Sequence, residues 1–393
     1  MVRKRFIHKL ICGGVGCAGL LSAYAGPIGE VAPGAPRYDV PAKPRAGAVT
    51  SKRDQSTPAG DHYEGRFNED GGLSGKGTYR WTNGNRYVGG FSGNQPHGRG
   101  VFTWANGNRY EGDYVRGVMQ GKGIFTWANG DLYEGDFVKG KRTGKGVFVW
   151  ENGDRFEGDF VNDKRTGHGM LKWVNGNRYE GDFVNDVRVG KGVFVWPNGS
   201  RYQGDFHDDM ANGYGVYFWF NGERYEGDFV DDKRTGRGVL TWPNGNRYEG
   251  DFANDYRSGR GVFSWANGNR YEGEFLRSQI TGEGVFTWPN GDVYRGSMMR
   301  GRMQGKGVFT WVNGERYEGD FLDNKRTGRG SYYWTNGNRL EGNFVKDRQV
   351  GEGILTTAEG KEISGGSDAS RMNRMMKPGG DTAPTLPEAG ELR

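Results

Sequence analysis

Carboxylates and arginines stand close together along this chain, and paired carboxylates can serve as a general acid and base. Glu111 and Asp113, two residues apart, are typical of the pattern. Arg109 stands beside them, and Arg99 precedes them by a short stretch. Because each carboxylate has a permanent cation nearby, these groups indicate a charge-paired surface. We therefore expect no catalytic residue among them and predict that the protein is not an enzyme.

The histidines and the glycine-rich strings do not indicate a ligand site. The five histidines never stand together at ligand spacing; they are His8, His62, His97, His168 and His207. Strings such as Gly98-Arg99-Gly100 lack the strand before and the helix after that a nucleotide-binding fingerprint needs. We expect no metal, no cofactor and no small-molecule substrate.

Six arginines share one position in stretches that read as long, solvated loops, where guanidinium groups could bind phospholipid headgroups. They are Arg142, Arg165, Arg188, Arg234, Arg257 and Arg326. Acidic residues such as Asp163 and Asp186 occupy the same stretches. The two interpretations are a headgroup-binding loop edge and a mixed, solvated edge.

The elements that position these side chains repeat every 23 residues. All twelve tryptophans keep this period, from Trp81 to Trp334, and an aromatic residue follows most of them six positions later. Each copy reads Y-E-G-D-F, a loop of about seven residues, G-x-G-V-F-x-W and x-N-G. Thirteen such units fill residues 63–363, so one structural unit is copied along the chain.

Two short runs rich in Val, Phe, Tyr and Trp, separated by Asn-Gly, predict a β-hairpin in each unit. Proline precedes Asn-Gly at Pro197, Pro243 and Pro289. Proline fits the second position of a type I turn, so we predict a three-residue loop with glycine in the left-handed conformation. The fold class is therefore all-β, an elongated single-layer antiparallel meander of about 13 hairpins.

This loop length sets the register of the strands. It places Trp104 opposite Asn108 and Phe102 opposite Tyr110, with the aromatics and the glycines on one face. That structural aromatic face includes Trp104, Tyr110, Trp127, Tyr133, Trp242 and Tyr248. The other face should carry cross-strand ion pairs: Arg99 with Asp113, Lys122 with Asp136, Lys145 with Asp159, Lys191 with Asp205, Arg237 with Asp251, Arg260 with Glu274 and Lys306 with Asp320. His168 replaces the cation opposite Asp182, and Glu283 faces Ser297.

The motifs Y-E-G-D-F, G-x-G and N-G-x-x-Y at 23-residue spacing resemble MORN (membrane occupation and recognition nexus) repeats. The resemblance implies a twisted single-layer β-sheet, often a half-pipe, that serves as a scaffold or dimerisation surface. Phospholipid binding has also been attributed to the family. Leu340 and Ile363 depart from the pattern by replacing the aromatic residue, as terminal repeats often do.

The segments outside the array predict export. Residues 1–25 have the basic start, the apolar stretch and the Ala23-Tyr24-Ala25 site of a signal peptide, and they contain both cysteines. Residues 26–62 read as a flexible tether rich in Pro, Ala and Gly. The tail, residues 364–393, reads as mostly disordered, with a short helix over 369–376 as the alternative. Most of the net charge of +6 lies in the leader and tether, which argues against nucleic-acid binding.

The function hypothesis is a non-catalytic scaffold of the periplasm, cell envelope or secreted space. It would form a homodimer through its terminal units or dock protein partners on its repeat surface. One alternative is weak contact with anionic phospholipid, or with an envelope surface, through the six arginines. The other is glycan binding by the Trp and Tyr face, against the interpretation that those rings are the core itself.

Overall fold

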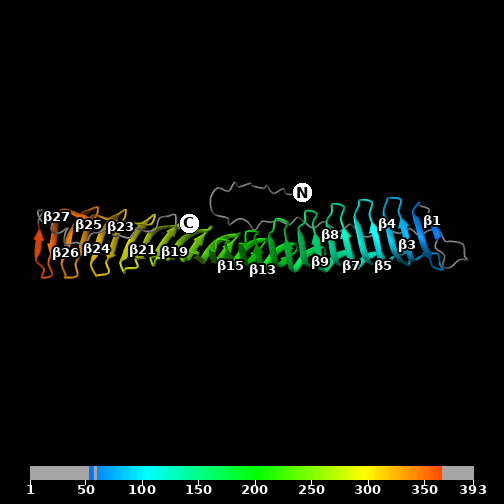
Figure 1. The fold of residues 1–393 in the computed structure, drawn as a ribbon, viewed down its shortest axis with the longest axis horizontal. Coiled ribbons are helices and arrows are strands. Elements are labelled where there is room, and N and C mark those ends of the chain that lie inside the picture. Colours follow the sequence, from blue (N-terminus) through cyan, green and yellow to red (C-terminus); the bar gives the residue numbers. More distant parts are fainter. Residues whose placement is uncertain (1–52, 57–59, 365–393) are drawn as a thin grey trace. The chain divides into compact units, whose positions relative to one another are not determined.

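The computed structural model describes residues 53–56 and 60–364 (Figure 1). Throughout these residues the secondary structure consists of strands and turns, without a helix, as predicted. No helix that could cross a membrane occurs within the same ranges. The predicted signal peptide and all of the predicted tail except Ser364 lie outside the described residues. Arg53–Ser56, inside the predicted tether, forms strand β1.

The chain divides into two compact units, one ending at Phe220 and the other starting at Asn221. The described strands of the N-terminal unit are β1 (Arg53–Ser56), β2 (His62–Phe67), β3 (Leu73–Arg80), β4 (Arg86–Ser92), β5 (Gln95–Thr103), β6 (Arg109–Val115), β7 (Val118–Thr126), β8 (Leu132–Val138), β9 (Lys141–Val149), β10 (Arg155–Val161), β11 (Lys164–Lys172), β12 (Arg178–Val184), β13 (Val187–Val195), β14 (Arg201–His207) and β15 (Met210–Phe218).

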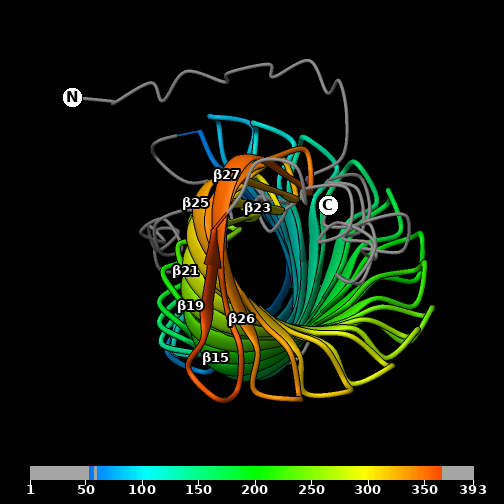
Figure 2. The same cartoon turned by 90° about the vertical axis from the view of Figure 1, so that its left-hand side faces the viewer.

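The strands of the C-terminal unit are β16 (Arg224–Val230), β17 (Lys233–Thr241), β18 (Arg247–Ala253), β19 (Tyr256–Ser264), β20 (Arg270–Leu276), β21 (Gln279–Thr287), β22 (Val293–Met299), β23 (Arg302–Thr310), β24 (Arg316–Leu322), β25 (Lys325–Tyr333), β26 (Arg339–Val345), β27 (Arg348–Thr356) and β28 (Glu362–Ser364). Within each unit every strand pairs antiparallel with its neighbours in sequence. Figure 2 shows the strands of the C-terminal unit fanning out in sequence order, as expected of a twisted sheet. The predicted meander is confirmed.

The turn at W-x-N-G has the predicted three-residue loop. The Trp104 N–H donates to the Asn108 carbonyl at 2.9 Å, and the Gly107 N–H donates to the Trp104 carbonyl at 3.0 Å. Gly107 has a φ of 92°, which glycine adopts without a Cβ clash. The loop that contains Pro197 has the same hydrogen bonds. The proline therefore identified the loop length correctly.

The loop of about seven residues predicted at the other end of each hairpin is wrong. From β4 onwards a two-residue turn stands there instead, such as Asn162-Asp163, whose φ angles of 50° and 73° are those of a type I′ turn; in the first repeat the loop has the five residues 68–72. The other residues of the predicted loop continue the strand through a β-bulge, since Gly158 pairs with Gly169 but Asp159 pairs with Thr166. The bulge bends each strand and brings Phe160 within 5.4 Å of the Phe156 ring centroid.

The predicted register is confirmed on both faces. Phe102 lies opposite Tyr110 and Arg99 opposite Asp113. The Nζ to carboxylate distances are 2.8 Å for Lys122–Asp136, Lys145–Asp159 and Lys306–Asp320, and 2.6 Å for Lys191–Asp205. Arg237 lies 3.7 Å from Asp251, and Arg260 faces Glu274 in register. His168 lies 3.3 Å from Asp182, and the Ser297 hydroxyl donates to Glu283.

The core of each unit is a row of aromatic rings lying directly on glycine backbone. A Cβ added to Gly112 or Gly123 would come within 2.4 Å of the Tyr110 ring or its hydroxyl. The Tyr110 hydroxyl donates to the carbonyl of Asp113 at the bulge, at 3.2 Å. Its ring meets that of Tyr114 edge to face, with centroids 5.2 Å apart. Glycine recurs at these positions because any side chain would displace the ring.

Candidate functional site

Most of the tyrosine rings and half of the tryptophans of the aromatic face are buried. Tyr110, Tyr133 and Tyr248 are fully buried, and Trp127 is 8% exposed. Trp104 and Trp242 are half-buried at the ends of their strands. The burial of the tyrosines and of Trp127 agrees with the interpretation that these rings form the core. Glycan binding by this face is therefore not proposed further.

The six arginines are not in solvated loops. Each lies on a strand of the aromatic face: Arg142 on β9, Arg165 on β11, Arg188 on β13, Arg234 on β17, Arg257 on β19 and Arg326 on β25. All are buried except Arg234, whose side chain is 17% exposed. The bulge explains the error, because it turns residues that read as a loop into a strand that faces the rings.

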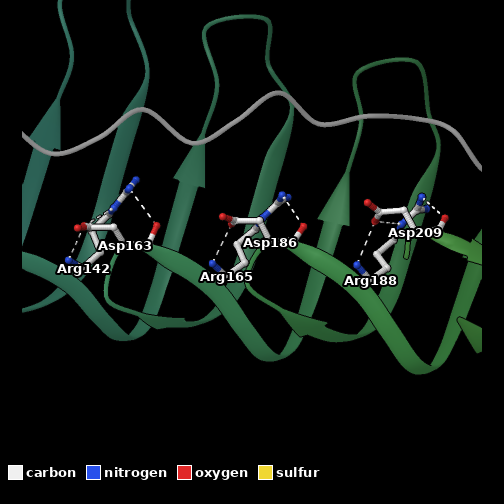
Figure 3. A network of polar contacts seen from close by, with 6 residues as sticks. All are labelled: Arg142, Asp163, Arg165, Asp186, Arg188 and Asp209. Carbon is white, nitrogen blue, oxygen red and sulfur yellow. Dashed lines mark hydrogen bonds and ion pairs between the residues drawn. The ribbon is translucent and has the colours of Figure 1, made fainter. Parts of the chain in front are cut away.

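Five of the arginines bind an aspartate of the next two-residue turn, 21 positions later. Oδ1 of Asp163 accepts from the backbone N–H and from Nε of Arg142, at 3.0 and 3.2 Å. Nη2 of Arg142 donates to the Asp163 carbonyl at 3.1 Å. Arg165–Asp186 and Arg188–Asp209 repeat this geometry (Figure 3). Each such pair fastens one hairpin to the next.

Aromatic rings surround the far side of each guanidinium. The Cζ of Arg165 lies 5.4 to 5.7 Å from the centroids of Trp150, Phe156 and Phe183. Within the described residues, Nη1 of Arg165 has no hydrogen-bond acceptor, so cation–π attraction takes that place. Burial lowers the pKa of Arg142 and Arg165, and lowers that of Arg257, which has Ser278 in place of aspartate, to about 10. Arg257 therefore stays charged at neutral pH.

The headgroup-binding edge predicted for these six arginines is therefore corrected. Five of the cationic groups bind turn aspartates, that of Arg257 binds Ser278, and none except Arg234 is more than slightly exposed. A phosphate could reach them only by breaking a buried ion pair, which is strongly unfavourable. The fixed 21-residue spacing from arginine to aspartate is the sequence signal that could have predicted these ion pairs.

Other repeats use a different pair at the same two positions. Met119 precedes Gly140, and Ile280 precedes Gly301, each by 21 residues. The backbone N–H of Met303 donates to the Asn324 amide oxygen at 2.8 Å. In these repeats an apolar strand residue goes with glycine or asparagine in the turn, although Ala211 precedes Asp232, whereas arginine usually goes with aspartate.

A second ladder joins the hairpins at the Asn-Gly turns. Oδ1 of Asp131 accepts from the backbone N–H of Glu151 at 2.8 Å, and Oδ1 of Asp154 accepts from Val174 at the same distance. Asp131 and Asp154 are buried although both are acidic. Side chains thus join neighbouring hairpins at both rows of turns. The charged face remains as the open surface.

The charged face is hollowed into grooves in both units. In the N-terminal unit one groove of about 870 Å³ extends from Arg99 to Glu180, and another of about 500 Å³ extends from Glu64 to Glu111. In the C-terminal unit a groove of about 1380 Å³ extends from Arg295 to Ser364. The groove of about 870 Å³ is within the usual size range of ligand sites, and that of about 1380 Å³ is larger. Within the described ranges, no three side chains gather in a way that could hold a metal ion.

The edge at the two-residue turns exposes aliphatic and cationic side chains together. Val138, Val161 and Val184 are 45 to 52% exposed. Lys139, Lys141 and Lys164 are exposed beside them. Arg142 and Arg165 bind the aspartates of these turns, and the lysines add exposed positive charge along the edge.

Comparison with known proteins identifies the repeat. The family model described as MORN repeat matches residues 63–362 in thirteen consecutive copies. A search of curated proteins gave no match.

Two solved structures resemble parts of the chain only weakly. The TCP domain of SAS-4 (dCPAP) of Drosophila melanogaster, in complex with a proline-rich motif of Ana2 (dSTIL), is 16% identical, covers 40% of this chain and 86% of its own, and has a TM-score of 0.28. The TCP10 domain of Danio rerio CPAP, in complex with a peptide of Danio rerio STIL, is 11% identical, covers 80% and 97%, and has a TM-score of 0.21. Such low similarity carries no argument about function. The thirteen matched repeats, by contrast, fill most of the sequence, and the chain belongs to the MORN repeat family.

Proposed function

We propose that the protein is a non-catalytic, exported scaffold that self-associates or docks protein partners through its repeat surface. MORN repeats are typical of interaction and membrane-binding proteins, and thirteen copies give this chain a long open face. The observation that carries the proposal is the pair of end strands. Strand β1 pairs only with β2, and β28 only with β27, among the described residues. Open strand edges of this kind favour pairing with another chain.

Light scattering of the mature chain over a concentration series tests self-association. A dimer that dissociates on dilution is expected. Glu362→Pro removes an N–H that faces away from β27, at the open edge of β28, and should shift the series towards monomer. The matched control is Ala358→Pro, because proline occupies the same turn position at Pro197, Pro243 and Pro289. A strict monomer at every concentration would contradict the self-association.

Export is tested separately on the leader. If residues 1–25 are a signal peptide, the N-terminus of protein purified from the native host should begin at Gly26. Recovery of the chain with Met1 from the cytoplasm would contradict export. That result would not bear on the scaffold proposal, which light scattering tests.

Weak contact with anionic phospholipid is the second candidate, now placed on the turn lysines. Exposed valines beside lysines suit the interface of a membrane, where each cation near an anionic surface contributes about 1 kcal/mol. Replacing Lys139, Lys141 and Lys164 with Ser should abolish sedimentation with phosphatidylserine vesicles. Replacing Lys122, Lys145 and Lys191 on the charged face is the control and should change sedimentation with the vesicles little. Equal sedimentation of wild type and both variants would remove the lysine edge as the site.

A further inference from the structure

One cation on the charged face of the C-terminal unit has lost its acid. The centre of each G-x-G string carries a charge that faces the next strand, as Lys306 on β23 faces Asp320 on β24. Arg329 on β25 occupies the same repeat position but faces Asn343 on β26. Within residues 224–364, Arg329 is the one cation at this position that faces no acid.

The same acid is also missing one repeat earlier, but there the loss is compensated. Ser297 replaces the acid, and Glu283 replaces the cation opposite it. The Ser297 hydroxyl donates to Glu283, so both side chains are satisfied. Arg329 has no such partner, because no hydrogen bond or ion pair reaches its exposed side chain from any residue in 53–56 or 60–364.

The charge of the groove in the C-terminal unit favours an anionic group at Arg329. Arginines and lysines outnumber acidic side chains in its lining by four to three. Lys306 and Arg339 already bind acidic side chains, whereas Arg295 and Arg329 form no ion pair with any described residue. Glu352 also lines the groove, but it lies two strands and about 10 Å from Arg329, a distance at which solvent and salt screen most of its charge.

The tail begins inside this groove. Ser364, the last residue of β28, is part of its lining, and the residues that follow belong to the same compact unit. Arg329 lies three strands from β28, which is about 14 Å across the sheet. The first charged residue after Ser364 is Asp368, and four extended residues also span about 14 Å. Gly365 and Gly366 give the chain the backbone freedom to turn across the strands.

We propose that residues 365–371 of the tail bind in the groove of their own unit, with the carboxylate of Asp368 on the guanidinium of Arg329. Arg371, three residues further along the tail, is then within reach of Glu318 on β24, one of the acids that line the groove. The contact is made within one chain and does not depend on self-association through the end strands. A bound tail covers the groove, so a partner that uses this surface has to displace the tail.

The mobility of a nitroxide spin label on the tail tests the proposal. The label is attached to Ser370→Cys in the full chain, with Cys12 and Cys17 replaced by Ser, and its electron paramagnetic resonance spectrum is recorded. An immobilised component is expected in the otherwise unchanged chain. Arg329→Glu should lower the ratio of immobilised to mobile label about fivefold, as expected for the loss of an exposed ion pair. Combining it with Asp368→Lys should restore the ratio.

Asn343→Asp is the sharper variant, because it gives Arg329 the acid that other repeats have and leaves Arg329 in place. It should release the tail to a similar extent. Arg237→Glu is the matched control: Arg237 has the same repeat position on β17, far beyond the reach of four residues from β28, so the ratio should change less than about twofold.

Three results would overturn the proposal. The first is a label that is fully mobile in the otherwise unchanged chain. The second is a ratio that neither Arg329→Glu nor Asn343→Asp changes. The third is immobilisation that increases with protein concentration, because it would place the tail on a second copy of the chain.

Discussion

The two faces of the sheet differ in how strictly their side chains repeat. The aromatic face has a tyrosine over two glycines in nearly every copy, because the ring and the bare backbone fill the same space. The charged face tolerates Leu132, Arg295 and Glu283 at positions where other repeats have a different charge. The fold is therefore determined by one face, and the face that packs less is free to vary for recognition.

Alkaline pH should destabilise the aromatic face more than any other change. Burial raises the pKa of Tyr63 to about 12, and it raises the pKa of Tyr110, Tyr133 and Tyr248 further. Above the ordinary pKa of 10 only the unfolded chain loses these protons, so stability present below pH 10 is lost as the pH rises towards 12 and beyond. Phenolate absorbance should rise together with the loss of β-sheet circular dichroism. Titration of the buried tyrosines with the sheet intact would contradict a closed aromatic face.

Gly123→Ala should have the largest effect of any single substitution. Its Cβ would meet the Tyr110 ring at 2.4 Å, so the ring must move, at a cost of about 1–3 kcal/mol or more. Lys122→Ala, one residue away on the charged face, should change the free energy of unfolding by only about 0.5 kcal/mol. Chemical denaturation of both variants measures the difference. Equal midpoints would show that the two faces contribute alike.

Substitutions in the Arg142–Asp163 pair should have a somewhat smaller effect on the free energy of unfolding. Arg142→Met should cost about 2 kcal/mol, because it leaves Asp163 without its guanidinium while a similar volume is kept. Adding Asp163→Gly recreates the Met119 and Gly140 pair found elsewhere in the chain and should recover much of the loss. Denaturation midpoints of the two variants provide the test. A double variant that is less stable than Arg142→Met would refute the coupling.

Charge exchange on the open face should have the smallest effect. Arg237→Asp and Asp251→Arg should each cost about 0.2–1 kcal/mol, since both side chains are well exposed. The double variant should regain the part of that loss that comes from the ion pair, but not the hydrogen bond that Oδ2 of Asp251 accepts from the Arg260 N–H at 3.0 Å. No recovery in thermal melting would show that the register does not depend on this pair.

Sequence reasoning found the architecture and one turn but missed the other turn. Pro197 restricts its backbone so tightly that the loop length followed from it. Asn162 and Asp163 were hidden in a polar run that reads as a loop, and the bulge that continues the strand carries no proline or similar marker. A search for adjacent residues that tolerate positive φ would have found the type I′ turns.

The candidate site was only partly predictable for a related reason. Arginine is usually exposed, so Arg142 was assigned to solvent, and its burial depends on Asp163 in the next repeat and on rings brought over by the bulge. Arg329 reads as one more cation of a charged row. That it has no acid, and that Ser364 lines the same groove, became apparent only from the strand pairing and the shape of the charged face.

Hydroxyl-radical footprinting of the native protein tests the central distinction between the faces most directly. Tyr110, Tyr133 and Tyr248 should be protected, whereas Phe220 and Tyr256, which are 70 and 53% exposed, should be oxidised readily. Denaturant should remove the protection of all three tyrosines. Comparable oxidation of the two groups in the folded protein would show that the rings are open to solvent and would contradict the account.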